Sequence, residues 1–112
     1  MLLLSTAIAW SLAVGMSADT PPPWLARFSG AYQDCLFKEI DRQDETGRYS
    51  ERRVLAVCAT TRRIQIGNAR TALAGIRKPE LGKAAIDREF ARLDDMVWTI
   101  VGHIRVRHGR RS

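Results

Sequence analysis

Cysteine and histidine are scarce in this 112-residue sequence, which contains two of each. There is no Cys-x-x-Cys pair, so a redox dithiol is disfavoured. His103 and His108 are five residues apart and therefore lie on different faces of a helix, which makes them a poor metal-binding pair. The sequence also lacks a phosphate-binding glycine loop and the Gly-x-Ser-x-Gly and His-Glu-x-x-His motifs. We therefore predict that the protein is not an enzyme and has no catalytic residue, cofactor or metal site.

Charged side chains are absent from residues 1–18, and this segment predicts export. Its apolar run ends in small residues, which is typical of a cleaved secretory signal peptide. No basic residue follows Met1, and Met16 is bulky near the expected cleavage site, so two alternatives stay open: a membrane anchor over residues 2–18 and a buried helix. Residues 19–23 contain three consecutive prolines and predict a stiff spacer. The expected location is periplasmic or secreted, with a membrane-anchored protein as the alternative.

The rest of the chain has the composition of one small folded domain. Hydrophobic residues make up 46% of the sequence, which is too many for a disordered chain. The formal net charge is +6, and 15 of the 18 basic residues are arginine. A domain of this size buries only a modest fraction of its surface, so a single cross-link would contribute strongly to its stability.

The spacing of apolar residues predicts three helices and an all-α fold. The first helix, from residue 24 to about 42, has an apolar face made of Trp24, Phe28, Ala31, Tyr32, Cys35 and Leu36. Residues 50–78 predict one long helix whose apolar face comprises Val54, Val57, Cys58, Thr61, Ile64, Gln65, Ala69, Ala72 and Ile76. The third helix starts at Pro79 and carries a heptad seam made of Ile86, Phe90, Leu93, Val97, Ile100 and Ile104.

The connections between these helices are short, which predicts that neighbouring helices run antiparallel. Gly47 suits the left-handed residue that ends a helix, and Ser50 suits the N-cap of the next one. We therefore expect an up-down-up bundle of three helices over residues 24–108, followed by a basic tail at residues 109–112.

Cys35 and Cys58 lie at similar distances on either side of the turn around Gly47. In an antiparallel hairpin the two positions are nearly level, and both fall on inward faces, as a disulfide requires. Two buried free thiols are the alternative. Export favours the disulfide, which would close a loop of about 24 residues and stabilise the fold by roughly 3 kcal/mol in the chain-entropy model.

Charge is distributed unevenly along the sequence. Residues 51–78 carry seven basic residues and one acidic residue, and residues 96–112 carry four basic residues and no acidic one. The simplest explanation is that these charges pair within the bundle or are solvated. Asp94 and Asp95 likewise predict a solvated helix face, although Asp94 flanks the heptad seam and is also placed to pair with an arginine of another helix.

The alternative explanation of the basic charge is an anion-binding surface. On the predicted central helix, one line opposite the apolar face contains Arg52, Arg63, Arg70 and Arg77. This line would span about 38 Å, and it would be extended by the C-terminal Arg105, Arg107, Arg110 and Arg111. Anionic lipid, phosphorylated glycolipid, an acidic polymer or an acidic protein surface would complement it. Nucleic acid would suit the same charge, but export would separate the protein from that partner.

The sequence thus favours a small exported helical protein that acts as a binding module, with the arginine line as its contact surface. One alternative is a membrane-tethered structural subunit, in which the heptad seam or Trp24 and Trp98 would dock a partner helix. A cytosolic nucleic-acid-binding protein is the second alternative.

Overall fold

The computed structural model describes residues 21–75 and 79–111, without the side chains of residues 79–81 and 109–111. Within this part of the chain all regular structure is helical. The helices are α2 (Pro23–Thr46), α3 (Glu51–Val57), α4 (Ala59–Leu73) and α5 (Pro79–Arg111). The predicted all-α fold is therefore confirmed. The predicted signal peptide, or anchor, lies outside the described residues.

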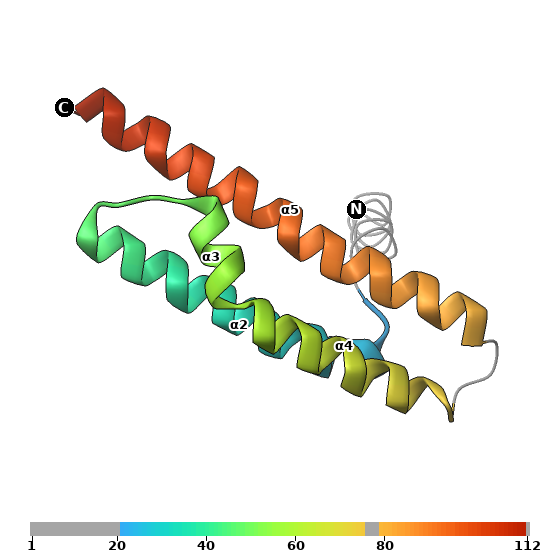
Figure 1. Cartoon of the computed structure of the whole chain (residues 1–112). Coiled ribbons are helices and arrows are strands. Elements are labelled where there is room, and N and C mark those ends of the chain that lie inside the picture. Colours follow the sequence, from blue (N-terminus) through green and yellow to red (C-terminus); the bar gives the residue numbers. More distant parts are fainter. Residues whose placement is uncertain (1–20, 76–78, 112) are drawn as a thin grey trace, which may run out of the picture.

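The helices pack lengthwise in a bundle-like arrangement. Figure 1 shows that the chain runs along α2, returns through α3 and α4, and then runs along the long α5. α4 packs chiefly against α2, whereas α3 packs against both α5 and α2. Every helix contacts each of the other three, so no helix is peripheral.

The central segment breaks at Cys58, and the prediction of one continuous helix over residues 50–78 is therefore wrong. Cys58 has a φ of −96° and a ψ of 6°, outside the α-helical region, and α3 is clearly inclined to α4 in Figure 1. Neither proline nor glycine occurs between Glu51 and Ile66, so the usual local causes of a kink are missing. The break instead coincides with tertiary contacts, because Cys58 is bonded to α2 and α3 packs on α5.

The turn between α2 and α3 follows the predicted signals. Gly47 ends α2 with a φ of 72°, and its N–H donates to the Gln43 carbonyl oxygen at 2.8 Å. The Ser50 side chain accepts the Arg53 N–H at 3.2 Å and so caps α3. The buried Gln43 amide also donates to the Ser50 carbonyl at 3.1 Å and accepts the Ser50 N–H at 2.9 Å. These bonds fix the path of the chain through the turn.

The core contains side chains from all four helices. Its buried members are Leu25, Tyr32, Leu36, Ile40, Val54, Cys58, Ala69, Leu73, Ile86, Phe90, Leu93, Val97 and Val101. The heptad seam predicted for α5 is confirmed for its first four residues, which are fully buried. Beyond them Val101, which the prediction missed, is fully buried, whereas Ile100 and Ile104 are partly buried. On α2 the prediction missed Leu25, Ser29 and Gln43, which are all buried.

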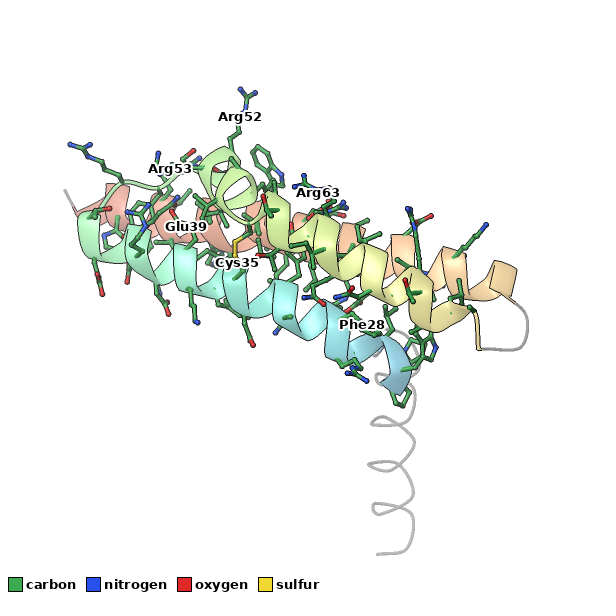
Figure 2. The ribbon with its side chains drawn as sticks, turned by 60° about the horizontal axis from the view of Figure 1, so that its bottom comes forward. Phe28, Cys35, Glu39, Arg52, Arg53 and Arg63 are labelled. Atoms are coloured by element: carbon green, nitrogen blue, oxygen red, sulfur yellow. A yellow bond between two sulfur atoms is a disulfide. The ribbon has the colours of Figure 1, made fainter. Side chains whose placement is uncertain are left out.

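Cys35 and Cys58 form the predicted disulfide, with their Cα atoms 5.9 Å apart. Figure 2 shows the bond crossing from α2 to the central segment at the point where that segment breaks. Cys58 is fully buried and Cys35 partly so. Disulfides of this structural kind are typical of proteins in oxidising compartments.

Gly82, near the start of α5, packs directly against Leu73 at the end of α4. A Cβ atom at position 82 would lie 2.0 Å from Leu73 Cδ1 and within 3.3 Å of two further Leu73 atoms. Leu73 is only 4% exposed, so its side chain has little room to move. The absence of a side chain at Gly82 therefore permits this close contact between α4 and α5.

We expect Gly82→Ala to lower the free energy of unfolding by about 1–3 kcal/mol, because overpacking forces side chains or helices to shift. The matched control is Gly102→Ala, also in α5, where a Cβ would meet nothing within 4 Å. There the higher helix propensity of alanine is expected to stabilise the protein by about 0.5–1 kcal/mol. Urea unfolding followed by circular dichroism measures both values. Stabilisation by both substitutions would contradict the described packing of α5 on α4.

Candidate anion-binding surface

The face that α4 turns to the core overlaps only partly with the predicted one, since Ala69 is buried as predicted but its inward neighbours are not the predicted residues. The inward face of α4 is formed by Arg62, Ile66, Ala69 and Leu73, at spacings of four, three and four residues. Two residues predicted to face inward are half exposed: Val57 at the end of α3, at 51%, and Ile64 on α4, at 52%. Hydrophobic spacing in this segment suits both faces, so it could not select the face that the structure buries.

Arg62 lies inward because its guanidinium pairs with Asp94 on α5. Nε and Nη2 of Arg62 donate to Asp94 Oδ2 at 3.2 and 2.8 Å. The buried Tyr32 on α2 donates its hydroxyl to Asp94 Oδ1 at 2.6 Å and stacks on Phe90. Burial and the hydrogen bond to Asp94 raise the pKa of Tyr32, so its hydroxyl remains a donor. The predicted pairing of Asp94 with an arginine of another helix is thus confirmed, and the network joins α2, α4 and α5.

Arg63 and Arg70 lie on the outer side of α4, and both are exposed. Among the described residues neither side chain has an ion-pair partner. Arg52 is exposed as well, but it belongs to α3, on the other side of the break at Cys58. Figure 2 shows Arg52 and Arg63 projecting from differently inclined helices, so the predicted straight line of arginines is interrupted. Arg77 lies outside the described residues.

The C-terminal arginines differ in their surroundings. Arg105 pairs with Glu51, a largely buried carboxylate in the first turn of α3, and therefore contributes to the packing of α3 on α5. Arg107 is exposed. Arg110 and Arg111 belong to α5, so the helix continues where the sequence predicted a separate tail. Their side chains are not among those described.

His108 fastens this end of α5 to the turn between α2 and α3. Its Nε2 lies 3.0 Å from the Tyr49 hydroxyl and 3.6 Å from Asp44 Oδ1. The Tyr49 hydroxyl also donates to Asp44, and this hydrogen bond raises the pKa of Tyr49. Asp44 therefore contacts both the Tyr49 hydroxyl and the His108 ring.

A shallow groove of about 540 Å³ runs along α4 beside Arg63 and Arg70. It is lined by Ala59, Arg62, Arg63, Ile66, Gly67 and Arg70. Because Arg62 is committed to Asp94, the groove combines two available guanidinium groups with an apolar floor. We call this surface the α4 groove.

A second groove, of about 480 Å³, lies between the end of α2 and the start of α3. It is lined by Arg42, Gln43, Thr46, Arg48 and Arg53. Sequence analysis missed these three arginines because positions 42, 48 and 53 share no helical repeat. The sequence feature that could have revealed them is the predicted turn at Gly47, which brings residues on its two sides together. We call this surface the turn groove.

Glu39 lies beside the turn groove and is almost completely buried, at 6% exposed. It accepts a hydrogen bond from Arg42 Nε at 2.8 Å, and Arg53 Nε is 3.9 Å away. The hydrogen bond from Arg42 lowers the pKa of Glu39; burial opposes this, and the charges of both arginines reinforce it. Since the folded-state pKa is depressed, Glu39 stabilises the fold at neutral pH, and this contribution is lost as the pH falls through the lowered value.

The described part of the chain contains no group of three or more acidic, histidine or cysteine side chains that could hold a metal ion. Nor does any helix within it have the length and hydrophobicity needed to cross a bilayer. Comparison with known proteins finds no matching family model, curated protein or solved structure. Functional inference therefore rests on the residues of this chain.

We expect Asp94→Ala to destabilise the protein by about 1–3 kcal/mol, because it removes the partner of the Tyr32 hydroxyl and of Arg62. Asp95→Ala is the matched control, since the neighbouring carboxylate is exposed and should contribute less than about 0.5 kcal/mol. Thermal and urea unfolding compare the two variants. Equal stability of both would show that the network does not hold the three helices together.

Proposed function

We propose that this protein is a small, exported, non-enzymatic binding protein whose α4 groove contacts an anionic lipid surface. The observation that carries the proposal is the pair Arg63 and Arg70. Both are exposed, both line the same groove, and neither has an ion-pair partner among the described residues. We further infer that the domain is an up-down-up bundle whose middle helix is broken at Cys58.

The lining of the α4 groove favours a lipid surface over a small soluble anion. Arginine guanidinium groups bind phosphate oxygens through paired N–H donors. Ile66 lines the floor of the groove, and Ile64 is half exposed beside Arg63. A surface with both arginine and exposed aliphatic side chains is typical of peptides and proteins that lie in the headgroup region of a membrane. Anionic phospholipids and phosphorylated glycolipids both have this chemistry.

Two observations support export as part of the proposal. The Cys35–Cys58 disulfide is typical of the periplasm and the extracellular space, and residues 1–18 have the pattern of a signal peptide. In that location nucleic acid would not be a regular partner, so we favour lipid over nucleic acid as the anionic surface.

Sedimentation with lipid vesicles tests the function. We expect the protein to bind vesicles containing phosphatidylglycerol, to release as salt increases, and to bind neutral phosphatidylcholine vesicles much more weakly. The double variant Arg63→Ala/Arg70→Ala should bind about 10–30-fold more weakly, since each arginine near an anionic membrane contributes about 1 kcal/mol.

The control is Lys83→Ala/Arg88→Ala, which removes the same charge from two exposed positions on α5. It should retain nearly all of the binding. An equal loss in both double variants would mean that net charge alone governs binding, and would contradict a specific role of the α4 groove. Failure of the wild-type protein to bind anionic vesicles would refute the proposed function.

A further inference from the structure

The turn groove has a different character from the α4 groove. Its five lining residues are all polar, and three of them are arginines: Arg42 from α2, Arg48 from the turn and Arg53 from α3. A volume of about 480 Å³ lies within the range of small-molecule pockets. The absence of any apolar side chain in its lining disfavours a hydrocarbon ligand and favours a hydrophilic anion.

The backbone that carries the three arginines is held in place by hydrogen bonds. Gln43 binds the Ser50 backbone through both ends of its side-chain amide. The Thr46 hydroxyl donates to the Gln43 carbonyl at 3.1 Å, and the Arg48 N–H approaches that hydroxyl at 3.4 Å. The three arginines therefore project from a preorganised frame, which reduces the entropy lost when a ligand binds.

The charges around the groove are not balanced. Glu39 is the carboxylate that pairs with Arg42 and Arg53, so one negative charge faces two guanidinium groups, and Arg48 adds a third. The charge of a second carboxylate, Glu45, also reaches Arg42. Glu39 raises the pKa of Arg42, and Glu45 adds a smaller effect in the same direction. Even with both carboxylates counted, these five side chains carry a net positive charge.

The guanidinium groups also keep unused hydrogen-bond donors. Arg42 uses Nε and Nη2 on Glu39, which leaves further N–H groups of its five for another acceptor. The Arg53 side chain is 65% exposed and touches Glu39 only at 3.9 Å. Glu39 thus positions Arg42 and leaves both arginines able to donate to a ligand in the groove.

We propose that the turn groove binds one phosphate group of an anionic ligand, through Arg42, Arg48 and Arg53. Guanidinium forks match the tetrahedral oxyanion geometry, and three of them from separate segments surround one hollow. This site is separate from the α4 groove and does not depend on the function proposed for it. The group belongs either to a soluble phosphate ester or to a phosphomonoester lipid headgroup.

The test is a titration of the full chain with inorganic phosphate at constant ionic strength, followed by NMR of the arginine Nε–H signals. We expect saturable shifts at Arg42, Arg48 and Arg53. Arg53→Gln should weaken phosphate binding at least about tenfold, because it removes a charge-assisted hydrogen-bond donor. Arg48→Gln should have a similar effect, and Arg48 and Arg53 are both exposed, so circular dichroism can verify that each variant keeps the helical fold.

Arg52→Gln is the matched control, since it removes the same charge one residue away. Arg52 and Arg53 leave α3 in different directions (Figure 2), and Arg52 does not line the groove. We expect it to retain phosphate affinity within about twofold. Non-saturable shifts in the wild type, or an equal loss in Arg52→Gln and Arg53→Gln, would overturn the proposal.

Two further arms identify the source of the anion and separate this site from the α4 groove. Binding to phosphatidic acid vesicles that is weakened by Arg53→Gln would assign a lipid headgroup. Phosphate binding that depends on Arg53, with vesicle binding that does not, would assign a soluble phosphate ester. Arg63→Ala/Arg70→Ala should leave the phosphate titration unchanged, and loss of phosphate binding in that variant would contradict a separate site.

Discussion

The disulfide between Cys35 and Cys58 is the constraint on which the rest of the structure depends. It joins α2 to the one residue at which the central segment leaves the helical conformation. On one side of Cys58, α3 packs chiefly against α5, and on the other side α4 packs chiefly against α2. The turn groove lies on one side of the bond and the α4 groove on the other. A covalent link between helices that enclose a small core therefore fixes both arginine surfaces relative to each other.

Local signals predicted much of this fold from the sequence. Gly47 has the left-handed conformation expected of it, and Ser50 caps the next helix. The first four residues of the α5 heptad seam are fully buried, as their spacing on one helical face predicted. The two cysteines could be paired because a short turn sets the register of a helical hairpin, and because each falls on an inward face.

Other features could not be predicted, because they depend on contacts distant in sequence. The break at Cys58 has no proline or glycine beside it and reflects the packing of α3 on α5. The sequence placed Asp94 to pair with an arginine of another helix, but it did not identify Arg62, which lies 32 residues away. On α4 the side that carries Arg62 faces Asp94, and Ile64 is half exposed. The turn groove likewise depends on the hairpin, because its lining residues come from both sides of the turn. The predicted line of arginines therefore did not include Arg42, Arg48 and Arg53.

The most direct test of this account is the urea unfolding of the native protein with and without a thiol reductant, with the free thiols counted by alkylation. The account predicts that neither cysteine is alkylated before reduction and that reduction lowers the free energy of unfolding by roughly 3 kcal/mol. Two thiols that are freely alkylated in the untreated protein, or identical unfolding curves in the two conditions, would contradict the central role of the Cys35–Cys58 bond.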